Sequence, residues 1–205
     1  MRLMCDHFSL IRCKKFKYRQ IGASELREPI PGLRIYPIFL INYLTKTMTH
    51  CFVVDRSLGT LAKWLRILGY DTICEPEGSG QDFYARLEDD RILITRSGKI
   101  KKMWGDHHHA FITSNRLVEQ LKQVVGQIGI DRGDTRLFSR CIHCNLPIDE
   151  IDKNDAYGLV PDYIWETQDA FNQCPQCKRI YWSGSHAERS GEIINQIFDS
   201  REKNG

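Results

Sequence analysis

Apolar and polar residues change their spacing several times along the chain, and the first clear changes come just after residue 50. The run "CFVV", Cys51–Val54, is apolar without interruption and predicts a buried strand. Apolar residues then recur at helical spacing, at Leu58, Leu61, Ala62, Leu65 and Leu68. This spacing predicts a helix that Ser57 caps and Gly69 ends.

The same spacing rules predict five further elements. They are a strand over Asp71–Cys74, a helix over Asp82–Leu87, strands over Arg91–Thr95 and Ala110–Thr113, and a helix over Leu117–Ile128 that ends before Gly129. Strands and helices thus alternate, which is typical of a parallel sheet with helices on both faces. We therefore predict an α/β fold.

Polar side chains follow two of the predicted strands directly. Asp55 follows the first strand, and Arg96 and Ser97 follow the strand "RILIT". Ligands of parallel sheets gather outside the carboxyl ends of the strands, so these residues should lie near one another at a binding edge. An Asp before an amphipathic helix is also a common helix cap, and both roles remain open for Asp55.

Charge is distributed unevenly along the chain. Residues 1–46 hold nine Lys and Arg against three acids, so the remainder has a net charge of −3 although the whole chain is +3. Residues 1–47 have no sustained apolar period, and we expect a disordered extension; the alternative is a basic arm that touches nucleic acid. Met48, just before the first strand, resembles an alternative start.

Two features bear on the surroundings of the protein. The apolar run Ile35–Leu44 is about half as long as a membrane span and contains Pro37, so we expect no membrane anchor and a cytoplasmic protein. A local basic patch, "RSGKIKK", carries Arg96, Lys99, Lys101 and Lys102 without an acid. Binding of phosphates would have to use such a patch, because the chain from residue 47 onward is not cationic.

Four of the eight cysteines form two Cys-x-x-Cys pairs, Cys141 with Cys144 and Cys174 with Cys177. Two such pairs supply the four thiolates of a tetrahedral zinc site, and a site with four thiolates leaves no position for a catalytic water. We therefore predict a structural Zn²⁺ in a zinc ribbon.

Several histidines compete weakly with the four cysteines as metal ligands. His143 and His186 are expected at the surface or beside the site, because four cysteines complete it. The run "DHHH" at residues 106–109 is expected to be a polar turn, since adjacent residues of an extended segment point to opposite sides.

Several segments together resemble the PIN-like Mut-seven C-terminal RNase family. The segments are "VVDRSLGTLAKWLRILGYDT", "RILITR", "EQL", "LFSRCIHCN" and "VPDYIWETQDAFNQCPQCKRIYWSGSH". They cover about residues 52–189, and the Asp-Arg-x-Leu-Gly and Tyr-Trp-x-Gly-Ser-His motifs are the most specific. The resemblance implies a PIN-like nuclease domain over residues 48–138, followed by a zinc ribbon and a C-terminal helix over residues 139–205.

The family resemblance implies cleavage of RNA by acids that hold a divalent cation at the strand ends. Asp55 matches the first acid of the family, and Asp82 matches the acid in the following loop or helix. Ser97 stands where the family usually has an Asp, and Asn115 stands at a second position where an acid is common. Mg²⁺ or Mn²⁺ can be held by one or two carboxylates, but two missing acids weaken the case for two metal ions.

Two functions follow from this comparison. The first is a metal-dependent ribonuclease with Asp55, Asp82 and Ser97 at its catalytic edge. RNA phosphates would then lie against the basic side chains Arg56, Lys63, Arg66, Arg96, Lys99, Lys101 and Lys102. The alternative is a non-catalytic RNA-binding zinc-ribbon protein. For Lys63 and Arg66, a place on a solvated helix face explains the charges equally well.

Overall fold

The structure is a computed structural model that describes residues 50–80, 82–87 and 90–202. The extension predicted over residues 1–47 lies outside this range. The boundary predicted between residues 138 and 139 remains a prediction, and the two regions on its sides are described in turn.

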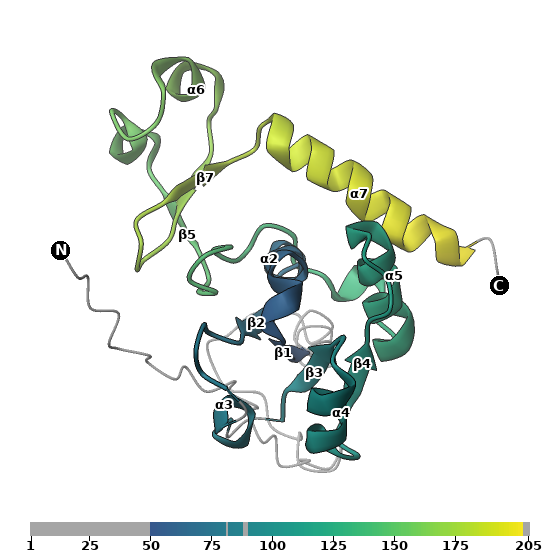
Figure 1. The fold of residues 1–205 in the computed structure, drawn as a ribbon. Coiled ribbons are helices and arrows are strands. Elements are labelled where there is room, and N and C mark those ends of the chain that lie inside the picture. The colour runs from purple at the N-terminus through teal and green to yellow at the C-terminus, as the bar shows by residue number, and fades with distance from the viewer. Residues whose placement is uncertain (1–49, 81, 88–89, 203–205) are drawn as a thin grey trace, which may run out of the picture. The chain divides into compact units, whose positions relative to one another are not determined.

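A four-stranded parallel sheet is the centre of the first region (Figure 1). Its strands are β1 (Cys51–Val54), β2 (Asp71–Cys74), β3 (Ile92–Thr95) and β4 (His109–Phe111), in the order β2-β1-β3-β4. The α/β fold with a parallel sheet is thus confirmed. Because β1 and β3 are central, their runs are apolar without alternation, as expected for strands buried on both faces.

One face of the sheet carries the larger core. Phe52 and Val54 of β1 pack there with residues of α2 (Gly59–Ile67), α5 (Leu117–Ile128) and α7 (Ser185–Glu202). These helices present the apolar stripe that the helical spacing predicted. The last helix thus completes the core of the sheet, although it follows the cysteine pairs in sequence.

The opposite face is covered by two short helices, α3 (Asp82–Ala85) and α4 (Gly98–Trp104). Val53 and Leu93, which alternate with the residues of the larger core, pack there against Tyr84, Ile100 and Trp104. The prediction of helices on both faces is confirmed.

Three local predictions need correction. The helix over residues 82–87 ends at Ala85, and the strand over residues 110–113 runs from His109 to Phe111. Ser57 is not the cap of α2: a 3-10 turn, η1 (Arg56–Leu58), precedes that helix, and Asp55 caps this turn by accepting from the backbone N–H of Ser57. Asp55 takes the cap because its carboxylate lies at the strand end, one residue before the turn.

Gly69, after α2, allows a close approach of two backbone segments. Its φ is +96°, and a Cβ atom there would lie 2.4 Å from the carbonyl oxygen of Arg136. Arg136 N–H in turn donates to the carbonyl of Leu68 at 2.9 Å. Any side chain at residue 69 would therefore push away the segment that leads into the first cysteine pair.

The second region contains a three-stranded antiparallel sheet. Its strands are β5 (Asp149–Ile151), β6 (Phe171–Gln173) and β7 (Ile180–Trp182), in the order β5-β6-β7. The insert between β5 and β6 contains η3 (Lys153–Ala156) and α6 (Asp162–Thr167). Its small core consists of Ala156, Val160, Ile164 and Phe171. Within the residues described, no helix has the length and apolar character to cross a membrane.

Candidate active-site edge and metal centre

The register of the parallel sheet brings three polar residues to one edge. Val54 lies opposite Cys74 on one side and Ile94 on the other, so the residues that follow, Asp55, Glu75 and Thr95, lie at the same level. Side chains alternate along a strand, so these three continue the face that α3 and α4 cover.

Asp55 is at the centre of this edge and is 2% exposed. One carboxylate oxygen, Oδ1, accepts from the backbone N–H of Ser57 at 3.0 Å and from the Ser57 hydroxyl. The other, Oδ2, accepts from the Thr95 hydroxyl and from the backbone N–H of Arg96 at 2.8 Å. The expected proximity of Asp55 to the end of the "RILIT" strand is thus confirmed.

These four hydrogen bonds use the whole acceptor capacity of the carboxylate. A carboxylate has about four lone-pair sites, and four protein donors occupy them. Asp55 therefore both caps η1 and ties β1 to β3. A cation could reach it only if a donor turned away, and the hydroxyl of Ser57, at the surface end of the group, is the one free to rotate.

Glu75 is a second acid at this edge, and the sequence-based interpretation missed it. Its carboxylate accepts from the backbone N–H of Arg56 at 3.3 Å and from the Tyr84 hydroxyl at 3.0 Å. Burial, the bond to Glu75 and the negative charges of Glu75 and Asp55 raise the pKa of Tyr84 far above its ordinary value. The rule that found Asp55 also applies to Glu75, which directly follows the predicted strand "DTIC".

The end of β3 completes the edge. The Arg96 guanidinium donates to the side-chain oxygen of Asn115, which links β3 to the segment after β4. The Ser97 hydroxyl caps α4 and accepts from the backbone N–H of Ile100 at 3.4 Å. Ser97 thus follows β3 and Asn115 follows β4, and their part in a catalytic site stays a prediction.

Asp82 lies apart from these contacts. It is on the exposed side of α3 and faces Arg86 across 3.8 Å, with both side chains more than three-quarters exposed. Within residues 50–80, 82–87 and 90–202, only the four cysteines form a group of three or more ligands that could hold a metal ion. The described carboxylates therefore do not form a cluster of three.

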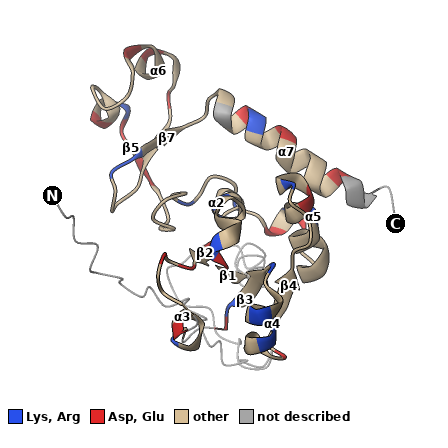
Figure 2. Cartoon of the chain, viewed as in Figure 1, with Lys and Arg blue, Asp and Glu red and all other residues tan. Residues whose placement is uncertain are grey.

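Most of the basic residues predicted to contact RNA are exposed. Lys99, Lys101 and Lys102 lie on α4, which carries a patch of positive charge (Figure 2). Arg56 and Lys63 are exposed on η1 and α2. Arg66 differs, because its guanidinium donates to backbone carbonyls inside the protein.

The two cysteine pairs form turns with the same hydrogen bonds. In the first, Cys141 N–H donates to the carbonyl of Leu146 at 2.8 Å, and Asn145 N–H donates to the carbonyl of Cys141 at 2.9 Å. In the second, the equivalent bonds start from Cys174 and Lys178 and measure 3.0 Å each. The residue after each pair, Asn145 or Lys178, has a positive φ of 62° or 58°. We name these turns the first and the second knuckle.

The four sulfur atoms fit one tetrahedral metal ion. They lie within 4.8 Å of one another, and the Cys141 and Cys177 sulfurs are 3.7 Å apart. Zn–S bonds of about 2.3 Å would put sulfurs about 3.8 Å apart. Four cysteines could therefore bind a structural metal ion, and the predicted Zn²⁺ is an ion that suits four thiolates in this geometry. His143 is exposed and is not part of the group, as expected; the side chain of His186 lies outside the described part of the chain.

The sulfurs differ in their surroundings. Burial opposes ionisation of Cys141, but hydrogen bonds from the Tyr181 hydroxyl at 3.0 Å and from the backbone N–H groups of Cys144 and His143 outweigh it and lower its pKa to about 7. Burial and the neighbouring sulfurs raise the pKa of Cys144 to about 12. These hydrogen bonds favour the thiolate form of Cys141, which is the form that binds a metal ion.

The first knuckle is bonded to the edge strand β2. The Asn145 side chain accepts from Thr72 N–H and donates to Asp71, each at 2.9 Å. Arg66 binds the Thr72 carbonyl and, at 2.7 Å, the carbonyl of Ile142. Side chains of the first knuckle and of α2 thus satisfy the outer backbone groups of an edge strand that would otherwise be open.

A family model described as the Mut7-C RNAse domain matches residues 50–194, which include the parallel sheet, the polar edge and both knuckles. The chain belongs to the Mut7-C RNAse domain family. The comparison with curated proteins gave no match, and the comparison with solved structures gave none either. The match confirms the family resemblance found in the sequence, and it covers most of the chain of this Mut7-C RNAse domain.

Proposed function

We propose that this Mut7-C RNAse domain is a ribonuclease that cleaves RNA with the help of one weakly held Mg²⁺ or Mn²⁺ ion. The observation that supports this most is the meeting of Asp55, Glu75 and the backbone of Arg96 at one edge of the sheet in a member of an RNase domain family. Carboxylate oxygens are the ligands that Mg²⁺ prefers, and one or two suffice when waters and phosphates complete the shell.

Each residue of the edge has a part in this proposal. Glu75 holds the ion, and it replaces Asp82 of the sequence-based expectation because Asp82 points to solvent beside Arg86. Asp55 orients Ser57 and the start of the Arg96–Ser97 turn. When bound, the ion supplies positive charge that lowers the pKa of a water molecule and neutralises the scissile phosphate. Arg96 and the lysines of α4 hold neighbouring phosphates.

The alternative is a non-catalytic RNA-binding protein, and the saturated carboxylate of Asp55 favours it. An acid whose four lone pairs accept from protein donors stabilises the fold without any ion. The two functions differ in one measurement, since the ribonuclease turns over RNA in a way that a chelator stops and the binding protein does not.

Glu75→Gln is expected to lower chelator-sensitive cleavage at least about tenfold without changing the melting temperature. Glutamine keeps an oxygen that can accept from Arg56 N–H and the Tyr84 hydroxyl, but it has no charge for a cation. Glu77→Gln is the matched control, because Glu77 is exposed two residues further on and is given no role. The measurement is cleavage of end-labelled RNA across a Mn²⁺ titration. Equal rates of RNA cleavage by Glu75→Gln and Glu77→Gln would contradict the proposal that Glu75 holds the ion.

Ser97→Asp is expected to tighten divalent binding and raise the rate of cleavage, each about tenfold. Asp caps a helix as well as Ser does, so α4 should stay intact. A charge about 4 Å from an ion is worth several kcal/mol at an effective dielectric near 20, and solvent at this half-buried position reduces it to about one.

Ser97→Asn is the control, because it keeps the cap and adds no charge. Calorimetric Mn²⁺ binding and cleavage are compared for both variants. The gain should shrink when Glu75 is also Gln, since groups that hold one ion are coupled. If Asp and Asn behave alike at residue 97, the edge does not hold a cation.

A further inference from the structure

An open groove of about 440 Å³ lies on the second region, beside the metal centre. Its lining includes Ile142 and His143 of the first knuckle, Lys178 and Arg179 from the second knuckle, and Tyr181 of β7. Leu159, from the insert, is 64% exposed and also lines it. The groove thus combines apolar side chains, an aromatic ring and two cations in a volume that suits a small ligand.

The cations of this groove have no acidic partner among the described residues. No acid lines the groove, and neither Lys178 nor Arg179 forms an ion pair with a described side chain. Burial, together with the charges of Arg179 and of Lys63 on α2, lowers the pKa of His143. Cations without acidic partners, together with apolar side chains in one groove, favour a ligand that has both an anionic and an apolar part.

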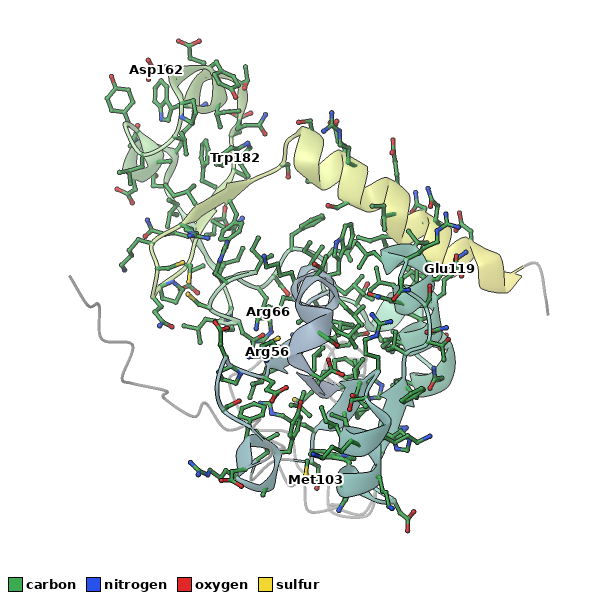
Figure 3. All side chains as sticks on the ribbon, viewed as in Figure 1. Arg56, Arg66, Met103, Glu119, Asp162 and Trp182 are labelled. Atoms are coloured by element: carbon green, nitrogen blue, oxygen red, sulfur yellow. The ribbon has the colours of Figure 1, made fainter. Side chains whose placement is uncertain are left out.

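The net negative charge of residues 139–205 gives no sign of a cationic groove. Residues 139–205 contain seven basic and eleven acidic residues, and seven of the acids fall between Asp149 and Asp169. These acids belong to β5 and the insert around η3 and α6, where Figure 2 shows the negative charge and Figure 3 labels Asp162. These seven acids therefore lie in β5 and the insert, whereas Lys178 and Arg179 line the groove beside the knuckles.

We propose that this groove binds one nucleotide of single-stranded RNA, with the base against Leu159, Ile142 and Tyr181 and the phosphate between Lys178 and Arg179. The choice of RNA rests on the proposed function, whereas the site is separate from the cleavage edge. Binding of single strands commonly combines aromatic surfaces for the base with cations for the backbone. Lys63 on α2 and Arg56 at the cleavage edge are both exposed, and the backbone N–H of Arg56 donates to Glu75.

Arg179→Ala tests the groove with little risk to the metal centre. Only the backbone carbonyl of Arg179 takes part in the second knuckle, where it accepts from Cys174 N–H, and alanine keeps that carbonyl. Tyr181 is left unchanged because its hydroxyl donates to the Cys141 sulfur. The matched control is Arg189→Ala, which removes an exposed arginine from α7, away from the groove lining.

The probe is a fluorescent ten-nucleotide single-stranded oligouridine. Its binding to zinc-loaded full-length protein is measured by anisotropy between 50 and 200 mM salt without added Mg²⁺ or Mn²⁺, so that no cleavage occurs. Arg179→Ala is expected to weaken binding about three- to tenfold and to reduce the salt slope by about one, whereas Arg189→Ala leaves both unchanged. A photoreactive uridine in the same probe is expected to cross-link to the peptide that contains Tyr181. Zinc content, checked by elemental analysis, should be equal in all three proteins.

The outcomes separate this inference from the proposed function. One outcome is that Arg179→Ala binds RNA more weakly, Arg189→Ala does not, and the wild-type protein fails to cleave RNA with every divalent ion tested. This outcome supports the groove and overturns the ribonuclease. Equal binding by both variants, with cross-links confined to α4, overturns the groove and leaves the ribonuclease standing. A dimer that Arg179→Ala dissociates would show that a second copy occupies the groove, and this too would overturn the inference.

Discussion

Cys174→Ser is expected to abolish stoichiometric metal binding and to unfold the three-stranded sheet β5-β6-β7. Cys174 is fully buried, and its sulfur is one of four that lie within 4.8 Å of one another. Among the residues that the structure describes, the apolar core beside it has only four buried ones, and so small a core rarely folds without a metal or a covalent link. The measurements are elemental analysis for zinc and the melting curve of the purified protein.

Loss of the metal should also loosen one strand of the parallel sheet, the edge strand β2. Thr72 N–H donates to the Asn145 side chain, which belongs to the first knuckle. When the knuckle loosens, this amide is expected to exchange with solvent much faster, whereas Val53 and Leu93, buried at 0% exposure in the central strands, stay protected. Residue-resolved hydrogen exchange of the zinc-free and zinc-loaded protein measures the difference.

Cys74→Ser is the matched control for this prediction. Cys74 ends β2, is half-buried, and is not one of the four clustered cysteines. Its replacement should leave one zinc per chain and the second region folded. A Cys174→Ser protein that still holds one zinc and melts like the wild type would contradict the assignment of the metal centre.

Asp55→Asn is expected to destabilise the fold by about 2–4 kcal/mol, which corresponds to a fall in melting temperature of roughly 5–15 °C. The amide that replaces one carboxylate oxygen cannot accept, yet two donors, from Ser57 or from Thr95 and Arg96, still point at it. One of each pair is a backbone N–H, which cannot turn away as a hydroxyl can, so it is left without an acceptor in a buried site. Thermal melting measures the effect, and a melting curve equal to that of the wild type would contradict it.

A loss of cleavage by Asp55→Asn therefore needs a control for folding. Thr95→Val serves, because it removes one donor to Asp55 and an acceptor for Ser97 N–H but leaves the carboxylate in place. Cleavage is compared per folded molecule, well below both melting temperatures. If Asp55 contributes charge to the cleavage edge, the folded Asn variant stays inactive while the folded Val variant cuts. If Asp55 only stabilises the fold, the two variants cut alike.

The sequence by itself determined the features that depend on neighbours within one element. The apolar run of β1 and the helical spacing of α2 and α5 were predicted closely, because burial imposes a period on residues a few positions apart. The group of four cysteines was also predicted from the sequence, since each knuckle needs only two cysteines with two residues between them. The helix α4 was missed because its seven residues contact the core mainly through Ile100 and Trp104, too few to show a period.

Only the tertiary structure decided which polar groups meet. The order β2-β1-β3-β4 puts Glu75 next to Asp55, whereas Asp82 lies on an exposed helix. The four donors that saturate Asp55 come from the end of β3 and from the turn after β1, which are about forty residues apart in sequence. The cationic groove likewise draws its lining from both knuckles and the insert, whose acids dominate the net charge of that segment. Composition averages charge along the chain, whereas folding separates the acids of the insert from the cations of the groove.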